Sequence, residues 1–409
     1  MTQSHNNQQK LTTIPNGWNW VVIKDITKEH KQGFYAVNAK AKSGDVKYIR
    51  ITDLMIPKIN FDNAPSISVS EKDYESFRIN VGDFLIGRSG AIGRYGICYE
   101  DRKAIFASYL IRFKFDQNTM LNEYFGELYQ SQLISRQLEL ITQGSSNQNI
   151  NAENIKSLVV PLPSLSEQKA IVKIIIVWDR GIEALEQLIA TKTKLKHTVT
   201  QQLLRGRKRF REFEKQEWQR TKISDFAKLS VRSTPKPNKP FKSLGIRSHG
   251  KGTFPKEDFE PEKIELTELY EVQENDLIVN ITFAWEGAIA IASPADSGAL
   301  VSHRFPTYVF DTERAIPEYF RHVIIQKWFV EKLGLISPGG AGRNRVLSKK
   351  DFAKLEVLMP SVEEQRKIAA VLNAQDREID LLQKQLAVLK KQKQGLMQKL
   401  LTGQIRVKI

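Results

Sequence analysis

The feature that most constrains this chain is a long internal repeat. Residues 158–206 reappear as residues 355–403, at a constant shift of 197 positions and without a gap. Each copy is preceded by a divergent region that opens near a tryptophan, Trp18 in the first and Trp218 in the second. A repeat of this length means that one structural unit occurs twice. The 409 residues therefore fold into at least two cores rather than one.

The repeated segment predicts a long helix with one narrow apolar stripe. Its apolar residues alternate between spacings of four and three, which is the pattern of a heptad seam. Two ordinary core helices are the alternative, but a helix this long with one narrow stripe packs poorly inside a small domain. We predict that the seam consists of Ile171, Ile175, Trp178, Ile182, Leu185, Ile189, Ile368, Leu372, Ile379, Leu382, Leu386 and Leu389.

Both copies carry signals for the two ends of such a helix. Ser164 and Ser361 can cap the first turn, and Glu167 and Glu364, three residues later, complete the pattern of a capping box. A glycine suited to a left-handed C-cap follows each helix at positions 206 and 403. Roughly forty residues at 1.5 Å per residue give helices of about 60 Å.

The interiors between these helices predict mixed α/β domains. Short alternating runs punctuated by glycine, such as residues 48–51, 83–87 and 109–113, indicate strands, and residues 122–143 indicate a helix. The fold class is therefore α+β: two α/β domains with short-stranded sheets, separated and linked by two long helices that form an antiparallel coiled coil with an internal pseudo-two-fold repeat. We place a disordered tail at 1–10, the first domain at 11–162, the central helix at 163–210, the second domain at 211–359 and the C-terminal helix at 360–409.

The charge balance favours a polyanionic partner. The formal net charge is +16, which attracts nucleic acid by screened Coulomb forces and counterion release, although membrane-surface proteins share such a balance. The single cysteine, Cys98, excludes an internal disulfide and a cysteine-built zinc site, as a reducing compartment allows. Because residues 1–10 do not resemble a signal peptide and no apolar stretch approaches membrane-spanning length, we expect a cytoplasmic protein that has no membrane contact.

Polar loops in equivalent places of the two domains are the best candidates for contacts to DNA. Asn and Gln can pair with adenine edges, Arg can pair with guanine or phosphate, and glycine allows close backbone approach. A flexible surface loop or a structural hairpin is the alternative for each segment. Our candidates are Arg50, Arg88, Arg94, Ser145, Ser146, Asn147, Gln148, Asn149, Arg247, His249, Lys251, Asn280, Arg343, Asn344 and Arg345.

The chain lacks the sequence signatures of catalytic chemistry. Residues 245–252 resemble a phosphate-binding P-loop, but Gly252 replaces the Ser or Thr that would hold magnesium. No Asn-Pro-Pro-aromatic run that would hold a target amino group is present, and none of the six histidines has zinc-ligand spacing with another ligand. We therefore expect no catalytic residue, metal or cofactor in this chain and no enzymatic activity in isolation.

The repeated motifs resemble those of the specificity subunits of Type I restriction-modification systems, over nearly the whole chain. The motifs are the Pro-Ser-x-x-Glu-Gln starts at 163–168 and 360–365 and the Leu-Leu-x-Gly ends at 203–206 and 400–403. The chain departs from the family pattern in lacking Pro-x-Gly before Trp218 and in the β-branched run at 174–177.

The resemblance implies that the two domains are target-recognition domains, each reading half of a bipartite asymmetric site in double-stranded DNA. It implies that the helices set the spacer and bind two modification (methyltransferase) subunits, which restriction (motor-nuclease) subunits join. S-adenosylmethionine, Mg and ATP would then be used by these partners in adenine methylation or restriction. A standalone coiled-coil DNA-binding regulator, or the recognition subunit of a Type IIB enzyme, remains the alternative.

Overall fold

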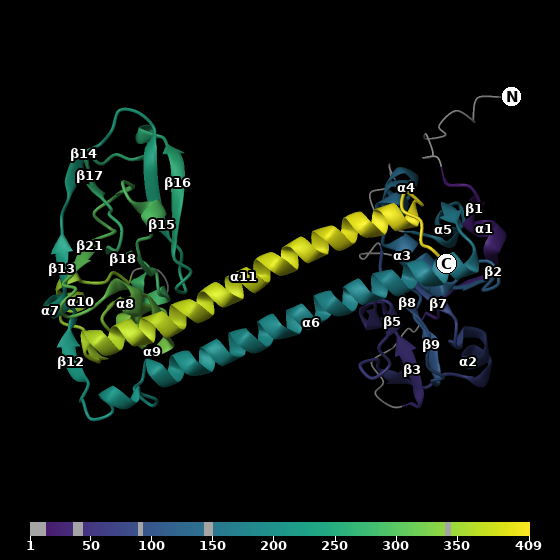
Figure 1. Cartoon of the computed structure of the whole chain (residues 1–409), viewed down its shortest axis with the longest axis horizontal. Coiled ribbons are helices and arrows are strands. Elements are labelled where there is room, and N and C mark those ends of the chain that lie inside the picture. The colour runs from purple at the N-terminus through teal and green to yellow at the C-terminus, as the bar shows by residue number, and fades with distance from the viewer. Residues whose placement is uncertain (1–13, 36–43, 89–92, 143–149, 340–344) are drawn as a thin grey trace. The chain divides into compact units, whose positions relative to one another are not determined.

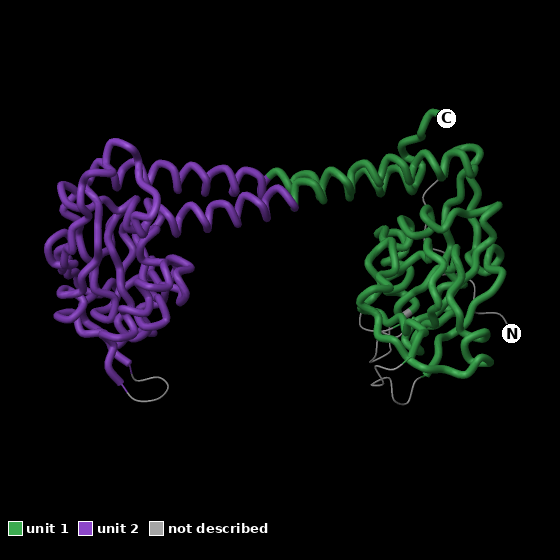
Figure 2. Tube along the Cα trace, turned by 90° about the horizontal axis from the view of Figure 1, so that it is seen from below, with its two compact units in different colours: residues 1–186, 385–409 green, residues 187–384 purple. Residues whose placement is uncertain are grey.

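The computed structural model of the chain contains two compact units and describes residues 14–35, 44–88, 93–142, 150–339 and 345–409. The first unit comprises residues 1–186 and 385–409, and the second comprises residues 187–384. Figure 2 shows that each unit combines one α/β domain with a part of both long helices. The boundary between the two units therefore falls within the two long helices.

The first domain is built on two sheets whose central strands are buried. The larger sheet has the order β2 (Thr27–Gln32), β10 (Leu110–Phe115), β7 (Phe84–Gly87), β8 (Tyr95–Ile97), β5 (Lys58–Ile59) and β4 (Leu54–Met55). The smaller sheet has the order β6 (Ser66–Ile67), β3 (Val46–Ile49) and β9 (Ala104–Phe106), and β1 (Asn19–Val22) pairs with β11 (Val159–Leu162). The helices are α1 (Ile23–Ile26), α2 (Glu71–Phe77), α3 (Asn122–Tyr129), α4 (Gln132–Thr142) and α5 (Ala152–Lys156), with a short 3-10 turn at Ile51–Asp53.

The second domain repeats this plan with a larger outer sheet. Its main sheet has the order β13 (Ala227–Ser230), β21 (Thr307–Phe310), β18 (Leu277–Val279) and β19 (Ile289–Ile291). The outer sheet has the order β14 (Ser233–Pro235), β17 (Glu268–Glu271), β20 (Leu300–Val301), β15 (Phe241–Ile246) and β16 (Thr253–Phe259), and β12 (Gln219–Lys222) pairs with β22 (Glu356–Met359). The α-helices are α7 (Ile223–Phe226), α8 (Pro317–Ile324), α9 (Lys327–Leu335) and α10 (Lys349–Ala353); the 3-10 helices are η2 (Arg211–Phe213), η3 (Pro261–Lys263), η4 (Ala284–Glu286) and η5 (Pro294–Asp296).

The region predicted as one helix over 122–143 consists of two helices, α3 and α4. The break lies at Ser131, whose hydroxyl donates to the carbonyl of Leu128. The second domain has the equivalent break between α8 and α9. A serine side chain that bonds to nearby backbone groups competes with the helix ladder in this way.

The two long helices, α6 (Leu165–Leu203) and α11 (Val362–Leu401), pair antiparallel within each unit (Figure 1). In the first unit Asp179 lies 2.5 Å from Lys393, and in the second Glu378 lies 2.6 Å from Lys192. The predicted antiparallel coiled coil is therefore confirmed. The structure places every predicted seam position among buried or half-buried side chains: Ile171, Ile175, Leu185, Ile368 and Leu372 are buried, and Trp178, Ile182, Ile189, Ile379, Leu382, Leu386 and Leu389 are half-buried.

The start of each long helix is joined to its domain by the same set of contacts. Glu167 accepts hydrogen bonds from Nε1 of Trp18 (3.0 Å) and from Nε and Nη2 of Arg406 (2.6 and 2.9 Å). Glu364 accepts from Nε1 of Trp218 (3.1 Å) and from Nε and Nη2 of Arg209 (3.0 and 2.7 Å). The tryptophan that opens each repeat is thus tied to the glutamate of the helix motif.

These contacts correct half of the predicted capping box. The backbone N–H of Glu167 donates to Oγ of Ser164 (3.3 Å), and that of Glu364 donates to Oγ of Ser361 (3.4 Å), as predicted. The glutamate carboxylates do not complete the reciprocal bond, because they bind the tryptophan and arginine side chains instead. The predicted C-cap is confirmed, since Gly206 and Gly403 have left-handed φ values of 65° and 73°.

The glutamine that follows each of these glutamates fixes a second helix start. Oε1 of Gln168 accepts the backbone N–H of Leu121 (2.9 Å), the residue before α3. Oε1 of Gln365 likewise accepts the N–H of Ile316 (3.1 Å), the residue before α8. Both glutamines are completely buried. The Glu-Gln pair in each motif is therefore explained by the packing of the domain against the long helix.

Candidate nucleic-acid interface

Three loops meet at one edge of the first domain. The backbone N–H of Arg88, after β7, donates to the carbonyl of Tyr109 (2.9 Å), in the turn before β10. The carbonyl of Arg88 accepts the N–H of Ile150 (2.8 Å), which follows residues 143–149. Arg94, at the far end of the same loop, is exposed, and its guanidinium donates to the carbonyl of Ile51 (3.4 Å). Sequence segments that are far apart thus converge around Arg88.

The second domain builds the same junction from different side chains. The N–H of Ile281, after β18, donates to the carbonyl of Arg304 (3.0 Å), in the turn before β21. The carbonyl of Ile281 accepts the N–H of Leu347 (2.8 Å), which follows Arg345. The backbone scaffold is therefore conserved between the two domains, whereas Arg88 and Tyr109 of the first are replaced by Ile281 and Arg304. A constant scaffold with different side chains suits two surfaces that read different sequences.

A fourth loop joins this edge in the second domain. Residues 247–252 connect β15 to β16 and rest on η4, because the N–H of His249 donates to the carbonyl of Glu286 (2.7 Å). The Ser248 hydroxyl donates to Oε2 of Glu286 (2.8 Å). The run that resembles a P-loop is therefore the turn of a β-hairpin, and it lacks the helix N-terminus that holds phosphate in a P-loop.

Two candidate arginines of the second domain lie against aromatic rings. The guanidinium of Arg247 is 5.0 Å from the centre of the Phe254 ring, and that of Arg345 is 5.4 Å from the Trp285 ring. Arg247, His249 and Lys251 are exposed, and Arg345 is half-buried. Arg247 also donates from Nη1 to the carbonyl of Thr253 (3.1 Å), and a guanidinium beside a ring still has further N–H donors for a phosphate or a base edge.

Two other candidates are occupied by local structure. Arg50 makes a bidentate ion pair with Asp53, with both N–O distances at 3.0 Å, and this contact raises the pKa of the guanidinium. Asn280 is buried, and its Oδ1 accepts the N–H of Thr282 (3.1 Å). Arg50 therefore stabilises its loop through its guanidinium, whereas Asn280 uses only its Oδ1 in this way. Ser145, Ser146, Asn147, Gln148, Asn149, Arg343 and Asn344 lie outside the described residues.

The structure adds exposed aromatic side chains at the loops that carry the candidate residues. Tyr35 is 71% and Tyr109 61% exposed, and both lie at the turn before β10, since the N–H of Phe34 donates to the carbonyl of Phe106. Phe283 of the second domain is 41% exposed. Tyr109 lies at the start of a segment that the sequence predicted as a strand. The one sequence signal that could have identified it as an interface residue is an aromatic side chain next to a turn. Exposed aromatic residues next to basic loops can stack on bases.

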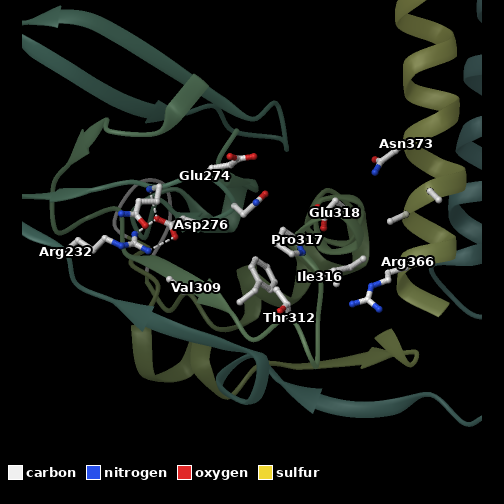
Figure 3. Close-up of a pocket in the computed structure, with 15 residues that line it drawn as sticks. Arg232, Glu274, Asp276, Val309, Thr312, Ile316, Pro317, Glu318, Arg366 and Asn373 are labelled. Carbon is white, nitrogen blue, oxygen red and sulfur yellow. Dashed lines mark hydrogen bonds and ion pairs between the residues drawn. The ribbon is translucent and has the colours of Figure 1, made fainter. Parts of the chain in front are cut away.

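A groove in the second unit runs between the domain and the first turns of α11 (Figure 3). Its volume is about 620 Å³. Arg232 and Asp276 form an ion pair at one end (2.6 Å), Ile316 and Pro317 of the α8 region lie in the middle, and Arg366 of α11 lies at the other end. This groove combines a mostly apolar lining with charged ends, so it suits a protein segment better than DNA.

The described part of the chain contains no cluster of three or more His, Cys, Asp or Glu side chains arranged to hold a metal ion. Burial raises the pKa of the Cys98 thiol to about 11, so this side chain is a neutral thiol near pH 7. None of the described helices is long and apolar enough to cross a membrane.

Comparison with known proteins gives a consistent result. The family model described as "Type I restriction modification DNA specificity domain" matches residues 15–194 and 215–391. The chain is 22% identical to the Type I restriction enzyme MjaVIII specificity subunit of Methanocaldococcus jannaschii, over 81% of this chain and 80% of the relative. A second relative from that organism, whose name places it in the same class, is 25% identical over 98% of this chain and 96% of its own length.

Solved structures share the fold. The HsdS subunit from Thermoanaerobacter tengcongensis aligns with a TM-score of 0.55 and 17% identity, covering 96% of this chain and 98% of that one. A chain from a study of complex assembly and conformational transition of the type I R-M system aligns with a TM-score of 0.61 and 16% identity, covering 96% of this chain and 100% of that one.

Proposed function

Because this chain belongs to the family of Type I restriction-modification specificity subunits, we propose that each of its two units reads one half of a bipartite, asymmetric DNA sequence. The observation that carries this proposal is the loop junction around Arg88 and its counterpart around Ile281, built on the same backbone hydrogen bonds but with different side chains. The net charge of +16 supplies the sequence-independent attraction to phosphate on which such reading depends.

The long helices are the proposed docking surface for two modification (methyltransferase) subunits. Outside their seam they expose large apolar side chains, among them Val177 (62%), Leu195 (50%), Leu381 (64%) and Val388 (55%). Apolar side chains repeated along an exposed helix face are typical of protein contact surfaces. The groove lined by Ile316 and Arg366 lies in the second unit at the start of α11, and in this proposal it extends the docking surface.

Catalysis in this scheme belongs to the partners. In this proposal the methyltransferase and motor-nuclease subunits would use S-adenosylmethionine, Mg and ATP, while this chain supplies the DNA sequence recognition.

The test is co-expression of this chain with its neighbouring methyltransferase, followed by mapping of N6-methyladenine in host DNA. We expect a single interrupted, asymmetric motif that disappears when this chain is omitted, and a methyltransferase that co-purifies with it. Methylation that persists without the chain, or a chain that binds DNA as a self-sufficient protein with no methyltransferase, would favour a standalone regulator. A methyltransferase partner that is itself fused to a nuclease would indicate a Type IIB enzyme.

A further inference from the structure

A second cavity, of about 440 Å³, lies in the second domain beside the candidate nucleic-acid interface. It is enclosed by the strands β15, β16 and β20 and by the loop that contains η4. The same η4 loop supports the hairpin turn at 247–252 through the carbonyl of Glu286. The cavity is therefore continuous with the edge that carries Arg247, His249 and Lys251.

The walls of the cavity are aromatic, with cations beside them. Four phenyl rings line it, those of Phe254, Phe259, Phe283 and Phe305. Gly245 lies beneath Phe254, and a Cβ atom there would collide with the ring, so the glycine is what allows Phe254 to lie across β15. Nζ of Lys256 is 5.6 Å from the Phe254 ring centre and 5.7 Å from that of Phe259.

One side of the cavity carries a donor and an acceptor. Oδ1 of Asn280 already accepts the N–H of Thr282 (3.1 Å), and within the described residues no group accepts from its amide NH₂. Oε2 of Glu286 accepts the Ser248 hydroxyl (2.8 Å), and no described residue donates to its second oxygen. A carboxylate at this position disfavours a phosphate inside the cavity, whereas Lys256 and Arg247 near the Phe254 ring favour a phosphate close by.

These features match one chemical class of ligand, a nucleobase. A flat ring with adjacent donor and acceptor atoms can stack on phenyl groups and pair with an amide and a carboxylate. Cavities of roughly 300–1,000 Å³ are the usual size for small planar ligands. We propose that this cavity receives a base extruded from the DNA that the second unit reads. The proposal rests on the proposed function and adds a recognition mode to it.

The strand that carries two of these phenyl rings has a much shorter counterpart in the first domain. The antiparallel neighbour of β15 is the long strand β16, which carries Phe254 and Phe259, and its parallel neighbour is β20. In the first domain the equivalent strand β3 pairs antiparallel with β6, which consists of Ser66 and Ile67. The two half-sites are therefore read by different means, and base extrusion belongs to one of them.

The experiment uses the assembled complex of this chain with its methyltransferase and a duplex that carries the methylated motif. Each base of both half-sites is replaced in turn by 2-aminopurine, whose fluorescence rises when it leaves the base stack. We expect a rise at one position in addition to the methylated adenine. Phe283→Ala should abolish that rise and weaken DNA binding by roughly 5- to 100-fold, the loss expected for one base–aromatic stack.

Further variants distinguish a binding defect from a folding defect. Glu286→Gln retains an acceptor for Ser248 but changes the edge presented to the base, so it should lower the additional signal while the chain still binds its methyltransferase. Leu229→Ala, at an exposed apolar residue of β13 that is not part of the candidate interface, should leave that signal unchanged. The rise at the methylated adenine should persist in all three variants.

Three results would overturn the proposal. The first is a complex that methylates its motif normally but shows no fluorescence rise beyond the methylated adenine. The second is an additional rise that survives both Phe283→Ala and Glu286→Gln. The third is a free chain that binds dAMP, dCMP, dGMP or dTMP, as seen from quenching of Trp285 fluorescence, while no additional position is extruded from DNA. Loss of methylation in the unmodified complex would instead contradict the proposed function, so the two failures are distinguishable.

Discussion

Replacing Glu364 with Gln removes the negative charge at the junction between the second domain and α11. The Glu364 side chain is 1% exposed and accepts two hydrogen bonds from Arg209 and one from Trp218. Glutamine keeps the shape and one oxygen acceptor, so the bond from Trp218 can persist. The guanidinium of Arg209, only 15% exposed, loses its counter-charge and one of the two Glu364 oxygens that accept from it, and keeps its bond from Nη1 to the carbonyl of Gln216.

The expected loss of folding free energy depends on how well water can solvate each arginine once its glutamate partner has been replaced. Removing one partner of a buried ion pair costs about 3–5 kcal/mol, and the residual exposure of Arg209 places Glu364→Gln near the lower end, about 3 kcal/mol. The equivalent substitution in the first unit, Glu167→Gln, leaves Arg406, whose side chain is 45% exposed. That guanidinium can be rehydrated, so the expected cost is only about 1 kcal/mol.

Differential scanning calorimetry of the two variants at the same salt concentration measures this difference. For a unit of this size, about 3 kcal/mol lowers Tm by roughly 6–12 °C and about 1 kcal/mol by roughly 2–4 °C. A double variant, Arg209→Met with Glu364→Gln, should cost less than the sum of the single variants, because no unpaired charge remains. Equal shifts for Glu364→Gln and Glu167→Gln, or additive single variants, would refute the reasoning that desolvation of the arginine determines the cost.

Three further predictions concern DNA binding, the helix ends and pH. Arg247→Ala and Arg345→Ala should each weaken DNA binding and reduce the slope of log affinity against log salt by about one, whereas Arg50→Ala, whose partner is Asp53, should lower stability and leave the slope unchanged in the same titration. Gly206→Ala and Gly403→Ala should each lower the free energy of unfolding in urea by about 1–2 kcal/mol, because both glycines have a left-handed φ. Gly403→Ala should cost more, because its Cβ would lie 2.5 Å from Cδ of Pro15, whereas a Cβ at position 206 would lie 3.5 Å from the Trp218 ring. The reverse order of the two losses would contradict this prediction. Burial raises the pKa of Glu127 from 4.5 to about 7. Between these two pH values the folded first unit retains a proton that the unfolded chain has released. The contribution of this group to folding stability is therefore fully present below pH 4.5 and is lost as the pH rises through 7. Glu127→Gln should therefore raise Tm at pH 8 and not at pH 4.5. Burial lowers the pKa of His322, at the equivalent place in the second unit, so the unprotonated folded form loses stability as the pH falls below 6.5, and His322→Gln should remove that loss in a pH series of melting curves.

Several elements could be predicted from the sequence because their signals are local and periodic. The seam from Ile171 to Leu389 follows from spacings of three and four, and the Gly206 and Gly403 caps follow from the conformational freedom of glycine. The repeat itself needs only a comparison of the chain with itself. The pairing of α6 and α11 could be expected because two helices with matching apolar stripes, separated by a whole domain, can bury those stripes on each other.

The candidate interface could be predicted only in part. The turn at 247–252 and the loop around η4 were both candidates, but nothing in their sequences indicates that His249 hydrogen-bonds to Glu286. Arg50 and Asn280 looked equivalent to the other candidates, because a sequence does not reveal whether a polar side chain already has a partner. Asp53 and Thr282 supply those partners.

The duplication, the two helices with their seam, and the family can all be identified without a structure. Each of these depends on spacing along the chain, which folding does not change. Long-range contacts, in contrast, make Glu167 and Glu364 bind a tryptophan and an arginine rather than complete a capping box. The tertiary structure alone brought Phe254, Phe283 and Glu286 around one cavity, because such contacts join residues tens to hundreds of positions apart and depend on strand pairing and loop geometry.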